Sequence, residues 1–394
     1  MQAVKVIIPG SFWDSQIYSS YLHLFLDDGS IAILDWKNAL DKLIQDNQKI
    51  AIALRVAFLD GNLLYEHGAN YLLSNEEIKG VIDRQFKELL SKTFEFKGIH
   101  DSRFNLRHQN NPFPFPHADS EIYQGQVYVG LKSGLFFSQK QDVKDKEVGK
   151  KSRKLWDFPV LDLAASNHYS SLAIATGSDG LYQLQVSSKK HDSYNNISPI
   201  KLAEKHCNSC DWSYQSIYGS SNTNSSFLAS FEIESQKKSN ESSNTQKGER
   251  KLKEIISSEK LFGTKGFSWG ARDKIYQYHD GLIDVISYDP HNKRLFKNLG
   301  TIALNLSDGE VISANVAPFG TVIECDNSLV IALSNGEFMT IEGEPVRWRV
   351  FPRSTNFTNQ LHIIYEDRIE ILSFVHDYLV KQEDKLAGIK VDLR

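Results

Sequence analysis

The sequence predicts an all-β fold, and three observations support that prediction. One short pattern, in which two apolar-rich runs flank a turn, occurs several times along the 394 residues. Its copies are separated by roughly 50 residues, or by twice that number. Phe and Tyr, which favour strands, are abundant at 22 and 16 residues. We therefore expect the chain to consist of repeated antiparallel strands.

The repeated pattern is clearest in SLAIATGSDGLYQLQV, residues 171–186. Gly180 permits the positive φ of a tight turn and Asp179 tolerates it, so the segment predicts a β-hairpin. Similar hairpins are predicted at 21–36, 126–139, 274–289 and 329–343, with a weaker copy at 361–374 that lacks a turn glycine. The shared turn glycines are Gly29, Gly134, Gly180, Gly281 and Gly336.

The spacing of these glycines indicates one unit whose turn is degenerate. Gly134 and Gly180 are 46 residues apart, whereas Gly281 follows Gly180 by 101 residues. We therefore expect a further unit near 212–262. The polar segment at 234–250 replaces the tight turn there, and its composition predicts a disordered loop. A linker between two domains is the alternative interpretation of this segment.

Repeats of this length, each with several short strands, are typical of the blades of a β-propeller. The five glycine hairpins, the degenerate unit and the weaker copy predict seven blades, with six or eight as alternatives. The strand-like VKVIIP at 4–9 precedes the first hairpin, so we expect it to complete the last blade and close the ring. The predicted ring comprises 1–36 and 111–394, and each hairpin supplies the two middle strands of a blade. A two-sheet sandwich also uses hairpins, but it gives no reason for a steady period.

The segments VYVGLKSGLFF and LAIATGSDGLYQL resemble the hairpins of β-propeller repeat proteins of the WD40-like kind. The resemblance covers most of the chain except residues 37–110. The Gly-His and Trp-Asp pairs of WD40 repeats do not recur in register, so no subfamily is assigned. The resemblance implies a fold and no particular activity, because propellers serve as scaffolds, hydrolases and receptors.

Residues 37–110 interrupt the repeats and predict an α-helical insertion after the first hairpin. From Ser74 onward the apolar residues recur at helical spacing, and Ser74 with Glu77 forms a capping-box pattern. Shorter helices are predicted at 37–46 and 49–59. The apolar stripe either packs on the ring or docks a partner. The charged face of the main helix is the candidate partner-docking surface, with Lys79, Asp83, Arg84, Lys87 and Glu88.

The sequence contains no motif that marks a catalytic, cofactor-binding or metal site. HCNSC at 206–210 offers at most half of a zinc site, and Cys325 is isolated. The basic segment 140–154 is interpreted as a solvated loop. Polar residues in the hairpin turns, which we expect at one common face of the ring, are the candidate binding residues: Asp27, Asp28, Lys132, Asp179, His279, Asp280, Asn335 and Glu366.

Charge and composition narrow the class of function. A net charge of -4 does not favour nucleic acid as a partner. No signal peptide or membrane-spanning run is found and cysteines are few, so we expect a cytoplasmic protein without membrane contact. We interpret the chain as a non-catalytic, cofactor-free scaffold or recognition subunit that binds another protein within a larger complex. A metal-dependent propeller hydrolase and a small-ligand sensor with its site in the channel are the alternatives.

Overall fold

The computed structural model describes residues 3–139, 148–166, 168–186, 198–223, 225–234, 249–304, 306, 310–333 and 337–374. The predicted disordered loop, apart from its two ends, therefore lies outside the described residues. The same holds for Asn335, for Gly336 and for residues 140–147 of the basic segment.

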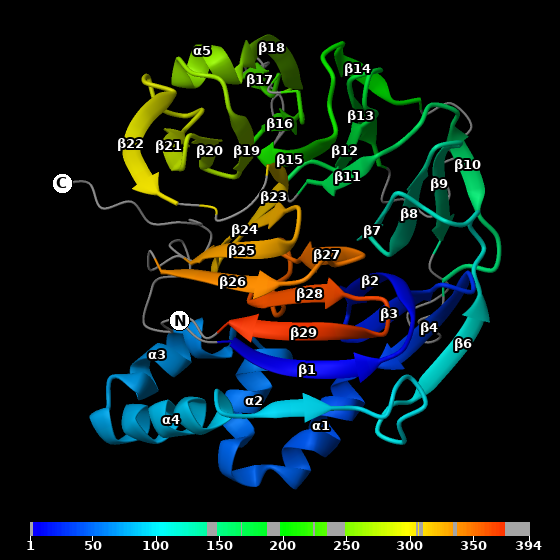
Figure 1. The fold of residues 1–394 in the computed structure, drawn as a ribbon, viewed down its shortest axis with the longest axis vertical. Coiled ribbons are helices and arrows are strands. Elements are labelled where there is room, and N and C mark those ends of the chain that lie inside the picture. The colour runs from blue at the N-terminus through cyan, green and yellow to red at the C-terminus, as the bar shows by residue number, and fades with distance from the viewer. Residues whose placement is uncertain are drawn as a thin grey trace, which may run out of the picture.

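Seven sheets surround a central axis, and the fold is a seven-bladed β-propeller (Figure 1). The first strand of each blade lies innermost and contacts the first strands of neighbouring blades. Blade 1 contains β2 (Phe12–Tyr18), β3 (Tyr21–Leu26), β4 (Ser30–Asp35) and β6 (Leu106–Asn110). Blade 2 contains β7 (Asp119–Tyr123), β8 (Gln126–Leu131), β9 (Gly134–Gln139) and β10 (Arg153–Trp156). Blade 3 contains β11 (Asp162–Ala165), β12 (Ser171–Ala175), β13 (Leu181–Gln185) and β14 (Ile200–Ala203).

The remaining blades follow the same order from the axis outward. Blade 4 contains β15 (Ser209–Ser213), β16 (Ser216–Ser220), β17 (Phe227–Glu234) and β18 (Glu249–Ser257). Blade 5 contains β19 (Phe267–Ala271), β20 (Lys274–His279), β21 (Leu282–Tyr288) and β22 (Phe296–Ala303). Blade 6 contains β23 (Val311–Ala317), β24 (Gly320–Cys325), β25 (Ser328–Leu333) and β26 (Phe338–Glu342). Blade 7 contains β27 (Arg347–Val350), β28 (Gln360–Ile364), β29 (Arg368–Phe374), β1 (Ala3–Pro9) and β5 (Thr93–Glu95). The prediction of seven blades is confirmed.

Most of the predicted hairpins are the two middle strands of their blades, as expected. The segment 171–186 forms β12 and β13, which pair from Ser171 with Gln185 to Ala175 with Leu181. The prediction is wrong for 329–343, which contains β25 and β26, the third and fourth strands of blade 6. The middle strands of that blade are joined by a turn at Asp326 and Asn327, which lacks the glycine that marks most of the predicted hairpins.

Two of the turn glycines are required by the fourth strand as well as by the turn. Gly134 and Gly180 have φ values of +138° and +101°. A Cβ at Gly134 would lie 2.0 Å from the Trp156 carbonyl oxygen, and one at Gly180 would lie 2.0 Å from that of Ala203. Trp156 and Ala203 end the fourth strands of their blades. Glycine therefore lets the outer strand approach the beginning of the third strand.

The ring is closed by β1, which supplies the fourth strand of blade 7. It pairs antiparallel with β29 over its whole length, from Ala3 with Phe374 to Pro9 with Arg368. The side chains of Val4, Val6 and Ile8 are fully buried. This is the closure that the position of VKVIIP predicts.

The predicted insertion is helical only in its first part. Its helices are α1 (Trp36–Asp46), α2 (Ala51–Phe58), α3 (His67–Leu73) and α4 (Glu76–Leu89), with 3-10 turns η1 (Gln48–Ile50) and η2 (Leu63–Tyr65). The rest of 37–110 contains β5, which pairs parallel with β1, and β6, the fourth strand of blade 1. The prediction of a helical insertion over 37–110 is therefore wrong at its C-terminal end, because the last helix ends at Leu89. All five residues of β6 are exposed or half-buried. Because no face of this strand is buried, its sequence does not need the alternating apolar pattern by which a strand is predicted.

The start of α4 also differs from the capping-box prediction. The N-cap is Asn75, whose side-chain oxygen accepts hydrogen bonds from the backbone nitrogens of Glu77 and Ile78 at 3.0 and 3.2 Å. Ser74 instead donates its hydroxyl to the carbonyl oxygen of Tyr71 at 2.6 Å. Asparagine is as good an N-cap as serine, so the helix begins one residue later than expected.

The insertion packs against the seam where the ring closes. Trp36, Leu54 and Phe58 belong to one apolar core with Val6 of β1 and Ile371 of β29. Of the predicted helical stripe, Ile82, Phe86, Leu89 and Phe94 are buried in this core, whereas Ile78 and Val81 are 38% and 44% exposed. Figure 1 shows α3 and α4 at the edge of the molecule, outside β1. No helix among the described residues is long and apolar enough to span a membrane.

Candidate binding site at the channel mouth

The innermost strands direct polar side chains into the channel of the ring. At the end where the first strand of each blade turns into the second, the channel opens into a cavity of about 410 Å³. A cavity of this size falls within the ~300–1,000 Å³ range of ligand sites. Its charged lining residues come from four blades: Asp119, Glu121, Asp162, Asp211, Arg349 and Arg353.

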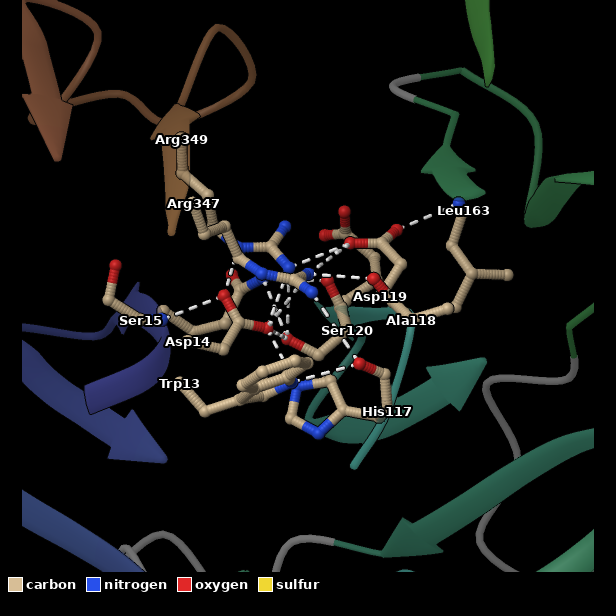
Figure 2. A network of polar contacts seen from close by, with 12 residues as sticks. Trp13, Asp14, Ser15, His117, Ala118, Asp119, Ser120, Leu163, Arg347 and Arg349 are labelled. Carbon is tan, nitrogen blue, oxygen red and sulfur yellow. Dashed lines mark hydrogen bonds and ion pairs between the residues drawn. The ribbon is translucent and has the colours of Figure 1, made fainter. Parts of the chain in front are cut away.

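Below this mouth, Asp14 is a fully buried carboxylate that joins blades 1, 2 and 7 (Figure 2). Arg349 donates to its two oxygens from Nε at 2.5 Å and from Nη2 at 2.7 Å. His117 Nε2 lies 2.9 Å from Oδ2, and the Ser120 hydroxyl donates to the same oxygen at 2.7 Å. Burial alone would raise the pKa of Asp14, but Arg349, Arg347 and these hydrogen bonds hold it well below its ordinary value.

Aspartates on the inner strands of blades 2 and 3 also bond to the next blade. Asp119 accepts from Arg349 Nη2 at 2.7 Å and from the backbone nitrogen of Leu163, in blade 3, at 2.8 Å. Asp162 accepts from the backbone nitrogen of Cys210, in blade 4, at 2.7 Å. Bonds to backbone donors thus join blades 2, 3 and 4 near the axis and support the cavity walls that these blades supply.

The carboxylates nearest the mouth are incompletely neutralised. Glu121 is paired with Arg353, but no described Lys or Arg forms an ion pair with Asp162 or Asp211. Burial, together with the neighbouring Asp119, raises the pKa of Asp162 well above its ordinary value. Burial also raises the pKa of Asp211 to about 6. The cavity therefore offers acidic groups that a cationic ligand would stabilise.

The pKa of Asp211 makes the stability of the protein depend on pH. Between pH 4 and 6 the folded state keeps a proton that the unfolded state releases, so the free energy of unfolding falls as pH rises through this window. Asp211→Asn removes this loss of stability. We expect the free energy of unfolding of the variant to exceed that of the wild type by up to about 3 kcal/mol at pH 8 and to equal it near pH 4. Thermal melts at the two pH values measure this, and a stability difference that does not change with pH would contradict it.

One wall of the mouth is the loop that joins β27 to β28, residues 351–359. Phe351, Arg353 and Phe357 from this loop line the cavity. The helical insertion supports it from behind, because Gly61 N donates to the Asn356 carbonyl at 3.0 Å and Asn359 Nδ2 donates to the Ala57 carbonyl at 3.1 Å. The insertion thus positions part of the site.

The candidate binding residues of the hairpin turns lie elsewhere. Asp27, Asp28, Lys132, Asp179, His279, Asp280 and Glu366 all sit at turns between second and third strands, and none of them lines the cavity. Asp28 accepts from the Ser30 backbone nitrogen at 2.8 Å, and His279 Nε2 lies 2.8 Å from Asp284 Oδ2 within the same blade. Asp28 and His279 thus bond within their own blades, and no hydrogen bond or ion pair between described residues joins candidate residues of different blades.

The candidate docking residues lie on α4, as predicted from the sequence. Arg84, Lys87 and Glu88 are exposed, and Lys79 and Asp83 are half-buried. Glu88 forms an ion pair with Lys92 at 3.1 Å.

The three cysteines are free and buried. Burial, with the neighbouring Asp162, raises the pKa of Cys207 and Cys210 far above the ordinary thiol value, so both are held as thiols. Over the described residues, no group of three or more His, Cys, Asp or Glu side chains is placed to hold a metal ion.

Sequence reasoning missed the channel residues, although the sequence holds a signal for some of them. Asp119, Asp162 and Asp211 begin or lie in innermost strands and are separated by 43 and 49 residues, which is close to one blade each. An aspartate that recurs with the blade period, outside the hairpin turns, is the pattern to search for. The arginines of β27 have no counterpart in other blades and give no such signal.

Comparison with known proteins adds similarity of fold only. No protein-family model matches the chain, and no curated protein matches it. Among solved structures, the β-propeller domain of Cps50 (Swd1) from Myceliophteria thermophila is 10% identical, with 93% of this chain and 98% of that chain covered and a TM-score of 0.48. The AfRom2 CNH domain is 12% identical, with 66% of this chain and 95% of that chain covered and a TM-score of 0.35.

Proposed function

We propose that this β-propeller is a non-catalytic recognition subunit, which binds a Lys- or Arg-bearing segment of another protein at the channel mouth. The observation that carries the proposal is Asp211, a carboxylate that lines the 410 Å³ cavity and forms no ion pair with a described Lys or Arg, although the charge of Arg353 acts on it from a greater distance. A cation inserted beside it gains a charge-assisted hydrogen bond and relieves the cost of the buried acid. The cytoplasmic location expected from the sequence belongs to the same proposal.

The bonds around the cavity favour a binding site that is already formed before the partner arrives. Arg349 is already engaged by Asp14 and Asp119, so it is not released to bind an anion. Phe351 and Phe357 at the mouth supply apolar surface for the stem of a long basic side chain. A rigid site of this kind loses little entropy when a partner binds.

The test compares the wild type with Asp211→Asn in tagged purification from the native cell at moderate salt, followed by mass spectrometry. We expect one stoichiometric protein partner with the wild type and at least a tenfold weaker association with Asp211→Asn, about 1.4 kcal/mol. The variant is expected to be more stable than the wild type, so loss of binding cannot come from misfolding. The matched control is Lys132→Glu, an exposed charge change at a hairpin turn outside the cavity.

The pH dependence of the association gives a second readout. Binding of a cation favours the ionised form of Asp211, so the affinity for the partner should fall as pH drops below 6. A synthetic peptide from the recovered partner, with its basic residue replaced by Gln, should lose binding. A partner that binds Asp211→Asn as tightly as the wild type would overturn the proposal.

A channel-site sensor for a small organic cation is the second candidate, because the same cavity would admit one. Agmatine and putrescine are suitable probes, since each carries a cation on a short stem. A ligand at one hundred times its dissociation constant stabilises the folded state by about 2.7 kcal/mol. A rise in melting temperature with these amines, seen with the wild type and absent in Asp211→Asn, would favour the sensor over the protein-binding subunit.

A further inference from the structure

The solvent-facing side of the helical insertion carries apolar side chains that the ring does not cover. On α4, Ile78 and Val81 are 38% and 44% exposed. At the end of α3, immediately before α4, Tyr71 and Leu72 are 79% and 56% exposed. Four apolar residues in eleven consecutive positions form an exposed cluster of the kind that marks an interaction surface.

The exposed charges on the same helix, unlike the half-buried Lys79 and Asp83, follow an order along its axis. Glu76 and Glu77 occupy its first turn, whereas Arg84 and Lys87 lie in its last two turns, and all four are exposed. No described residue forms an ion pair with any of these four side chains. Glu88, the acidic residue at the basic end, is already neutralised by Lys92. We call the surface formed by Glu76, Glu77, Val81, Arg84 and Lys87 the α4 face.

The charges of the α4 face are complementary to those of a second α4 that runs in the opposite direction. Glu77 and Arg84 are seven residues apart, close to two helical turns, so they project to nearly the same side. The midpoint between them falls between Gly80 and Val81. A two-fold axis at that midpoint places Glu77 of each copy opposite Arg84 of the other, with Glu76 and Lys87 flanking the pair.

Gly80 allows the two helices to approach closely at the axis. A Cβ at this position would meet nothing within 4 Å in the single chain, so the glycine is not required by packing there. Glycine inside an exposed helix destabilises it by about 1 kcal/mol relative to alanine. Across the two-fold axis, Val81 of one copy would occupy the space above Gly80 of the other. Interfaces of this self-complementary type are the usual ones in symmetric dimers.

We propose that the α4 face binds a second copy of this chain, as an antiparallel helix pair about a two-fold axis between Gly80 and Val81. The inference is independent of the proposed function, because the α4 face shares no residue with the channel mouth. A single pair of 14-residue helices is about 21 Å long, which is a small interface. The dimer is therefore expected in the micromolar range, and it should weaken as salt screens the paired charges.

Sedimentation equilibrium of the full chain tests the proposal, with charge reversal as the discriminating step. Glu76→Lys with Glu77→Lys makes the α4 face wholly basic, and Arg84→Glu with Lys87→Glu makes it wholly acidic. Each double variant alone should dimerise at least about tenfold more weakly than the wild type. An equimolar mixture of the two should form a one-to-one heterodimer of affinity close to that of the wild type, since the charges then match at both ends.

The control is Lys132→Glu with Lys205→Glu, two exposed charge reversals on other blades, which should leave dimerisation unchanged. Heterodimer formation in the mixture also proves that both variants are folded. A wild type that remains monomeric at 100 µM and low salt would overturn the proposal. So would a wild-type dimer that persists in both variants, because the contact would then lie on another surface.

Discussion

Deletion of residues 1–9 is expected to abolish cooperative folding of the ring. The deletion removes β1, and with it the buried side chains of Val4, Val6 and Ile8 and the whole ladder to β29. Burial of each such side chain contributes about 1.5–3 kcal/mol, so the three together approach the 5–15 kcal/mol stability of a typical domain. The deletion also leaves β29 as an exposed apolar edge, which invites aggregation.

Far-UV circular dichroism melting and limited proteolysis measure this effect. The full chain should melt in one transition, and the truncated chain should show a broad transition or none. A peptide of residues 1–11 added in trans should restore the transition, whereas a scrambled peptide of the same composition should not. A truncated chain that melts like the full chain would mean that β1 is not needed for closure.

Arg349→Met is expected to lower the free energy of unfolding by about 3–5 kcal/mol. Methionine keeps much of the side-chain volume, but Asp14 is then left as a fully buried charge that has lost its two hydrogen bonds to Arg349 and keeps only the more distant guanidinium of Arg347, at 3.8 Å. Asp119 loses the same partner. Removal of one member of a buried pair costs far more than the pair contributes, because the remaining charge stays desolvated.

Urea denaturation at pH 7 measures the loss. The matched control is Arg353→Met, whose partner Glu121 already has a raised pKa because of its burial, so we expect a smaller loss of about 1–2 kcal/mol. The double variant Arg349→Met with Asp14→Asn should recover part of the loss, since the uncompensated charge is gone. A loss below about 1 kcal/mol for Arg349→Met would show that water reaches Asp14 when the arginine is absent.

The ring was predictable because local turn chemistry repeats with the blade. Gly134 and Gly180 mark hairpins whose strands are adjacent in sequence, so the information needed to place them lies within a few residues. The strand β6 was not predictable in the same way. It is exposed and polar, and only the neighbouring strand β4 makes it a strand, after an intervening helical segment of more than 50 residues.

The channel mouth was the part least accessible to sequence reasoning. Asp14 and Arg349 are separated by 335 positions and meet only because the ring closes. In the sequence alone, an aspartate followed by a serine is typical of a turn and does not indicate a channel residue. The predicted binding residues were therefore those of the hairpin turns. What distinguishes Asp119, Asp162 and Asp211 is their place on innermost strands, which becomes known only once the blades are assigned.

The register of the closing strand determines how the ring responds to mechanical force. Ala3 pairs with Phe374, so the N-terminal end of β1 and the C-terminal end of β29 lie at the same end of their ladder. Tension that pulls these two ends apart acts across the hydrogen bonds and opens them one pair at a time, beginning at Ala3. We therefore expect the β1–β29 ladder to open at a low force, and to close again by the same sequence of pairs in reverse.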